Sequence, residues 1–195
     1  MEAVPDLTLQ TSFNASASQG SALGIGGHFN ISGNDGTITR FGWKAQHKSL
    51  LMFAGEANNV EIGVSNELFV NEINSDPSCV VNGSPEDATN LSFESSSGSP
   101  ASDYASDIVN FAAFLRYSAA PVPAPANTTT TVGQHVFETI GCSACHTVQF
   151  QTGLSCTAGL SKVSFSPYSD FAVHHMGSAL ADGISQGTAG GDERR

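Results

Sequence analysis

Residues 142–146 read Cys142-Ser143-Ala144-Cys145-His146, which is a C-x-x-C-H pattern. This spacing is the attachment signature of a c-type haem. Two intervening residues let both thiols reach the two vinyl groups on one edge of the porphyrin, and the histidine that follows at once ligates the iron from the proximal side. The sequence therefore predicts one covalently bound haem c, anchored by Cys142 and Cys145 and ligated by His146.

Three other interpretations of this cysteine pair remain open. A thioredoxin-like redox pair needs a strand-to-helix junction within a βαβ unit, and no such pattern surrounds the motif. A zinc site needs further ligands at close spacing, but the chain has neither a second C-x-x-C nor an H-x-x-x-H. A structural disulfide is the third interpretation. Function as a non-haem dithiol protein is therefore the least favoured.

The sixth iron ligand is sought downstream of His146, where three candidates follow one another: His174, His175 and Met176. Met176 is the only methionine after the motif. A thioether ligand raises the reduction potential relative to a second histidine, as suits an electron carrier. We therefore expect Met176 to be the second protein ligand of the iron, while an open sixth position also remains compatible with the sequence.

Two cysteines and one tryptophan lie outside the motif. Cys79 and Cys156 could form a disulfide in an exported protein, but nothing in the sequence fixes the distance between them, and free thiols are equally compatible. Trp43 is the only tryptophan. A buried structural indole is the favoured interpretation, and a place between redox centres is the alternative.

Composition excludes several classes of protein. The net charge is −11, with 7 Lys and Arg against 18 Asp and Glu, so no basic surface exists for nucleic acid. An acidic surface is compatible with a basic redox partner protein. No run of residues approaches the roughly 18 apolar positions of a membrane span. The 20 glycines and 8 prolines, among many Ser, Thr and Asn, indicate long loops.

Apolar spacing predicts three helices, over residues 45–57, 103–117 and 132–141. In the second, one face is apolar through Tyr104, Ile108, Phe111 and Leu115. The third follows a capping Thr130 or Thr131 and is expected to turn three side chains inward: Val136, Phe137 and Ile140. Residues 1–36 and 74–102 are expected to be irregular. The expected fold class is mainly α, with a cytochrome c-like haem domain and long irregular loops.

A Pro-rich and Thr-rich segment supplies the clearest boundary. Alternating prolines from Pro121 to Pro125, followed by Asn127 and four threonines, favour an extended connector. We expect a partial cytochrome-like domain without its own haem motif over residues 1–118, a linker over 119–131 and the haem domain over 132–195. The N-terminus shows no signal peptide, although haem attachment normally follows export to the periplasm or beyond.

Several segments together resemble the bacterial di-haem oxidoreductases, also called thiol-oxidoreductase-like proteins, which are related to the di-haem cytochrome c peroxidases. The resemblance covers roughly residues 24–193. Its matching stretches lie on both sides of the haem motif: Arg40-Phe41-Gly42-Trp43-Lys44-Ala45-Gln46, Phe53-Ala54-Gly55-Glu56-Ala57, Glu61-Ile62-Gly63-Val64-Ser65-Asn66-Glu67-Leu68-Phe69, Pro85-Glu86-Asp87-Ala88-Thr89, Tyr168-Ser169-Asp170-Phe171, His174, Met176-Gly177, Leu180-Ala181-Asp182-Gly183 and Gly190-Gly191-Asp192-Glu193.

The resemblance implies an electron-transferring part of a di-haem, peroxidase-like oxidoreductase. Two departures bear on that expectation. Members of the family carry two C-x-x-C-H motifs and this chain has one, and they continue past the point where it stops. In addition, His175 stands where the family usually has Asp. We therefore expect a piece that retains one haem, and leave its enzymatic activity open. The alternative is a mono-haem electron carrier without catalytic turnover.

Overall fold

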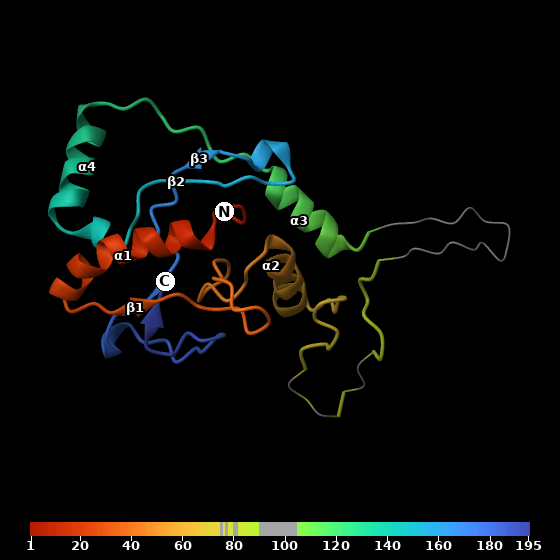
Figure 1. Cartoon of the computed structure of the whole chain (residues 1–195). Helices are drawn as coiled ribbons and strands as arrows, with labels where there is room; N and C mark the ends of the chain where they lie inside the picture. Colours follow the sequence, from red (N-terminus) through yellow and green to blue (C-terminus); the bar gives the residue numbers. More distant parts are fainter. Residues whose placement is uncertain (75, 77, 80–81, 90–104) are drawn as a thin grey trace. The chain divides into compact units, whose positions relative to one another are not determined.

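The computed structural model of the chain describes residues 1–74, 76, 78–79, 82–89 and 105–195 (Figure 1). These residues form two units. The first joins the N-terminal segment Met1–Lys48 to the C-terminal segment Ala119–Arg195, and the second comprises Ser49–Ser118. A different division was expected from the sequence, into residues 1–118, 119–131 and 132–195. That division concerns the origin of each segment, and it stays a prediction.

The first unit contains two α-helices and two small sheets among its described residues. Its helices are α1 (Asp6–Ala22) and α4 (Thr128–Thr139), with the single turns η2 (Cys142–Ala144), η3 (Ala158–Leu160) and η4 (Ser178–Leu180). One antiparallel sheet has the order β1-β4-β5, from β1 (Gly27–His28), β4 (Val173–His175) and β5 (Glu193–Arg194). The other sheet pairs β2 (Phe150–Gln151) with β3 (Ser164–Phe165).

A small apolar core holds the first unit together. Phe150 and Phe171 pack with their ring centroids 5.7 Å apart, and Phe150 also meets Phe165 across the β2–β3 pair at 6.4 Å. Val4, Leu9 and Ile38 complete the buried cluster. Since Leu9 comes from α1 and Ile38 from the following loop, burial of these side chains ties the N-terminal segment to the C-terminal one.

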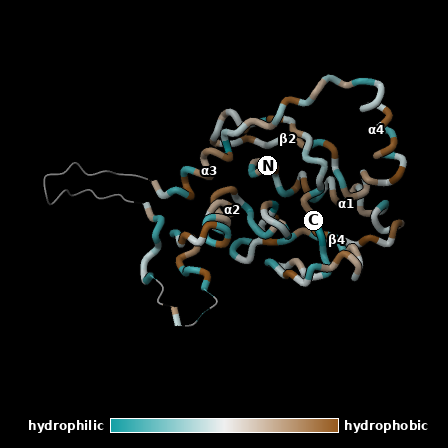
Figure 2. Tube along the Cα trace, turned by 180° about the vertical axis from the view of Figure 1, so that it is seen from behind, coloured by the Kyte–Doolittle hydropathy of each residue, from teal (hydrophilic) through white to brown (hydrophobic). Residues whose placement is uncertain are grey.

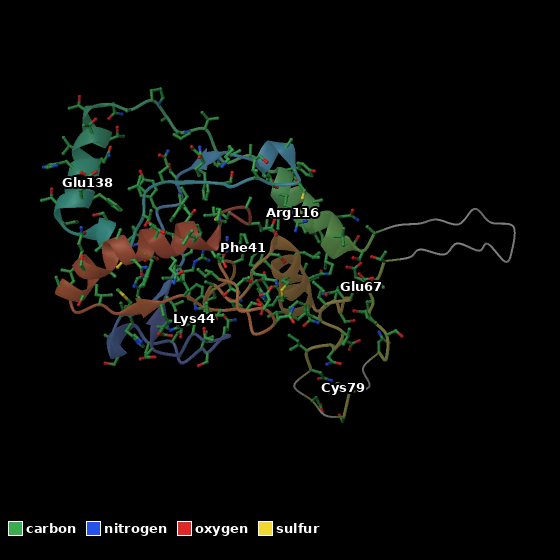
Figure 3. All side chains as sticks on the ribbon, viewed as in Figure 1. Phe41, Lys44, Glu67, Cys79, Arg116 and Glu138 are labelled. Atoms are coloured by element: carbon green, nitrogen blue, oxygen red, sulfur yellow. The ribbon has the colours of Figure 1, made fainter. Side chains whose placement is uncertain are left out.

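A buried lysine fixes the last loop of this unit. The side chain of Lys44 is fully buried, and its ammonium donates to the carbonyl oxygens of Gly190 and Glu193 and pairs with Asp182 (Figure 3). Asn30, also buried, donates to the carbonyl oxygen of Gln186. A buried charge is stable only when it is fully paired, so these contacts constrain the whole segment from residue 182 to residue 193.

The second unit is built on two helices. α2 (Leu50–Ala57) continues into the π-helical turn η1 (Asn58–Ile62) and contacts α3 (Asp107–Tyr117). Ser49 caps α2 by accepting a hydrogen bond from the amide of Met52. α3 has no cap from its own Ser106; instead the buried carboxylate of Asp87 accepts from the amides of residues 107 and 108 at 2.7 and 3.0 Å.

The structure corrects the expected fold class. The described residues are 35% helical and 11% strand, with two small sheets, so the prediction of a mainly α, cytochrome-like fold is wrong. Strands of two or three residues leave no alternating pattern in a sequence, which is why they were missed. The helix α1 lies in the segment 1–36 that was expected to be loop, because this segment is rich in Gly, Ser and Asn and α1 has almost no apolar periodicity.

The three expected helices are present with shifted bounds. α2 starts five residues later than expected, at its Ser49 cap, and Asp103 and Tyr104 lie outside the described residues. α4 starts earlier because Asn127 and Thr130 form a reciprocal capping box. Figure 2 shows hydrophobic stretches along α4, yet none of its side chains is buried. The expected inward face of Val136 and Ile140 is therefore wrong.

The contact between β1 and β4 leaves no room for a side chain at Gly27. A Cβ at Gly27 would lie 2.5 Å from Nδ1 of His174 and 2.9 Å from the carbonyl oxygen of Val173. We expect Gly27→Ala to lower the free energy of unfolding by about 1–3 kcal/mol, the usual cost of overpacking. Gly33→Ala is the control, because a Cβ there meets nothing within 4 Å. Urea unfolding measures both, and equal stabilities would contradict the β1–β4 pairing.

Candidate functional site

The C-x-x-C-H segment forms a tight turn at the end of α4. Gly141 has a φ of +90°, which ends the helix and favours glycine. Cys142–Ala144 then form the turn η2, and the amide of His146 donates to the carbonyl oxygen of Cys142 at 3.0 Å. Ala144 is buried, and η2 contacts both α1 and α4. The turn therefore has a fixed place against two helices.

All four predicted site residues line one cavity of about 320 Å³. Cys142, Cys145 and His146 come from η2 and its end, and Met176 comes from the residue that follows β4. Further side chains complete the wall: Leu23, Ile25, Ile140, Ser169, Asp170, His174, Arg194 and Arg195. A mostly apolar wall with a few convergent polar groups is typical of a cofactor site.

A second cavity adjoins the first. It has a volume of about 420 Å³ and shares Ile25, Cys145 and His174 with its neighbour. A larger open depression of about 580 Å³ runs along α1, and none of the four predicted site residues lines it. The chemistry-bearing side chains thus gather around the two adjoining cavities.

His146 is oriented by one hydrogen bond. Its Nδ1 lies 2.7 Å from the carbonyl oxygen of Tyr168, so this nitrogen donates and Nε2 keeps its lone pair. The ring of Phe137 packs edge-on against Tyr168 at 5.6 Å and lies 6.3 Å from that of His146. A histidine whose second nitrogen donates to a carbonyl is the usual arrangement of an iron-ligating imidazole.

The sixth-ligand candidates differ in their surroundings. His174 is buried and its Nε2 lies 3.0 Å from the carboxylate of Asp170, which is also buried. His175 does not line the cavity; it contacts Asp192 and Glu193. Met176 lines the cavity and is 40% exposed. Of the three, Met176 is the one that faces the cavity without a polar partner holding its side chain.

The cysteines are all free in the structure, and all four lie in its described part. Burial raises the pKa of the Cys145 thiol, and the charge of Asp170 raises it further. An activated redox thiol at the start of a helix has a lowered pKa instead, and this motif follows the end of a helix. Cys79 and Cys156 are exposed, and neither forms a disulfide.

Charged groups surround the C-terminal side of the cavity. Asp182 pairs with Arg194 and Lys44 and accepts from the indole of Trp43 at 2.9 Å. The hydrogen bond from Trp43, together with the two cations, holds the pKa of Asp182 well below its usual range. Trp43 is 63% exposed, so the favoured interpretation of a buried structural indole is wrong.

Two further findings limit the chemistry of the described residues. Within them, no group of three or more His, Cys, Asp or Glu side chains is placed to hold a metal ion. A haem iron needs only one or two axial ligands, so its requirements are different. Among the same residues, no helix has the length and apolar character needed to cross a membrane.

The sequence predicted Cys142, Cys145, His146 and Met176 as site residues, and the structure places all four around one cavity. Nothing in the sequence indicated that the backbone of Tyr168 orients His146. Tyr168 supplies a carbonyl group, which any residue could supply, and its backbone has a φ of +50°. Phe171, two residues after Ser169, has a φ of +64°. Non-glycine residues in this region are uncommon and often lie at functional sites. In the sequence, residues 168–171 were indicated only by their resemblance to the di-haem oxidoreductases, and not by any local pattern.

Comparison with known proteins identifies the family of the chain. A family model described as "Di-haem oxidoreductase, putative peroxidase" matches residues 30–195. The match covers most of the chain, including the C-x-x-C-H turn, β4 and the final loop. Comparisons with curated proteins and with solved structures gave no match. The chain therefore belongs to the di-haem oxidoreductase family.

Proposed function

We propose that this chain carries one c-type haem and passes single electrons through it as part of a di-haem, peroxidase-like oxidoreductase. Cys142 and Cys145 anchor the porphyrin, His146 is the proximal ligand and Met176 is the distal ligand. The membership of the family supports haem as the cofactor. The covalent attachment and the ligands are this chain's own features and rest on the geometry of the cavity.

One observation carries the proposal. Cys142, Cys145, His146 and Met176 all line the same cavity, although Met176 is 30 residues away from His146 in sequence. These are the groups that a c-type haem requires: two thiols for the porphyrin edge and two soft or neutral donors for the iron. The residues present thus fit the cofactor that the motif implies.

The chain's residues perform distinct tasks in this site. When bound, the haem supplies a one-electron iron couple. Tyr168 holds His146 in the tautomer whose Nε2 is free to ligate. Partial burial and the charge of Asp170 raise the pKa of the Cys145 thiol, which favours its protonated form. Leu23, Ile25 and Ile140 supply apolar surface to the cavity wall.

Met176 suits the distal role better than His174 does. The Nε2 of His174 is 3.0 Å from Asp170, and ligation through that atom would leave a buried carboxylate without its partner. Met176 gives up no such contact. Its thioether would also raise the reduction potential above that of a bis-histidine haem.

The single motif defines what the chain contributes. We propose that residues 132–195 hold this haem, that residues 1–118 contribute no attachment motif of their own, and that 119–131 connect the two segments. Residues 119–127 form neither helix nor strand, while 128–131 already belong to α4. A mono-haem electron carrier is the second candidate, favoured by the one C-x-x-C-H motif in the sequence.

Covalent haem attachment also bears on where the protein works and on its redox partner. Covalent haem attachment normally takes place after export, so we propose that the protein works in the periplasm or outside the cell. Its electrons then come from or go to another redox protein. The net charge of −11 favours a basic partner, because opposite charges steer encounter.

The covalent attachment is tested by acid–acetone extraction of the chain made in cells that ligate haem. We expect the Soret absorbance to stay with the protein, and to be extracted after Cys142→Ala and Cys145→Ala are combined. The combination of Cys79→Ala and Cys156→Ala is the matched control, because those exposed thiols lie outside the cavity. Extraction of the colour from the unmodified chain would contradict the attachment.

The distal ligand is tested by absorbance at the red end of the visible spectrum. Sulfur ligation of a ferric haem gives a weak band there, and we expect Met176→Ala to abolish it. Met52→Ala in α2 is the control and should leave the band unchanged. Met176 would not be the ligand if the band persisted in Met176→Ala. The same would follow if the band were lost in His174→Ala but kept in Met176→Ala.

A further inference from the structure

Arg195 lines the same cavity as the C-x-x-C-H motif but comes from a different segment of the chain. It follows β5, whereas Cys142, Cys145 and His146 come from η2 and its end. One guanidinium nitrogen of Arg195 donates to the carbonyl oxygen of Gly42 at 3.1 Å, and its central carbon lies 5.4 Å from the ring centroid of Phe171. A guanidinium has five N–H donors, so this anchoring leaves most of them available.

The charge of Arg195 has no carboxylate partner. Its neighbour Arg194 is paired with Asp182, while Arg195 forms no ion pair within the part of the chain that the structure describes. Burial lowers the pKa of Arg195 and the charge of Asp170 opposes that shift, but a guanidinium stays charged at neutral pH. An unpaired cation on a cavity wall indicates an anionic group in the ligand.

We propose that Arg195 binds a propionate carboxylate of the haem, an inference that rests on the proposed function. The vinyl and propionate groups occupy opposite edges of a porphyrin. A porphyrin fastened to Cys142 and Cys145 therefore directs its carboxylates away from η2. Lys44 is occupied by the loop it anchors, and Arg194 by Asp182, which leaves Arg195 as the cavity-lining cation for this contact.

The interaction is tested by reversible binding of porphyrins to the full chain with Cys142 and Cys145 both replaced by alanine. Haem and haem dimethyl ester, whose propionates carry no charge, are titrated separately, and Kd is read from the Soret absorbance. We expect Arg195→Gln to weaken haem binding about tenfold or more, as for loss of a charge-assisted hydrogen bond, and to leave ester binding unchanged. Arg195→Lys should recover part of the haem affinity.

A matched control separates this contact from a general charge effect. Lys162→Gln removes the same charge from the same unit, at an exposed residue beside the depression along α1, and should change neither Kd. Equal weakening of haem and ester by Arg195→Gln, or no weakening of haem, overturns the propionate contact and leaves the proposed function standing. Failure of the chain without Cys142 and Cys145 to bind either porphyrin overturns the propionate contact as a source of affinity, while the proposed function is tested separately by acid–acetone extraction of the unmodified chain.

Discussion

The antiparallel pairing of β4 with β1 on one side and β5 on the other is the constraint on which the site depends. Gly27 lies opposite His174, and His174 lies opposite Arg194, so three distant segments are held in one register. The close approach at Gly27 and the buried ammonium of Lys44 fix this arrangement. Without it, His174, Met176, Arg194 and Arg195 would not share a cavity with the C-x-x-C-H motif.

The β1-β4-β5 sheet brings together a small number of groups that each have one task in the proposed site. The turn η2 presents the two thiols, Tyr168 sets the tautomer of His146, and the strand end at β4 brings Met176 to the same cavity. The polar pairs that remain are internal to the protein: His174 with Asp170 and Asp182 with its two cations. The cavity wall thus combines apolar side chains with a few polar groups, and the arginines of the C-terminal segment belong to it.

The sequence was informative where chemistry depends on fixed spacing and uninformative where it depends on tertiary contacts. Five consecutive residues led to the proposed attachment site and one methionine to the proposed distal ligand, and both assignments stay predictions. The fold class failed because α1 lacks apolar periodicity and the strands are only two or three residues long. The roles of Lys44 and Asp87 were not foreseeable either, since each acts on residues at least 20 positions away.

The most direct test of the account is the intact mass of the purified chain, produced in cells equipped for haem ligation and measured under denaturing conditions. The account predicts the polypeptide mass increased by the mass of one haem. A chain that weighs no more than its amino acids would contradict the central claim, and so would an increase by two haems, because the sequence offers a single attachment motif.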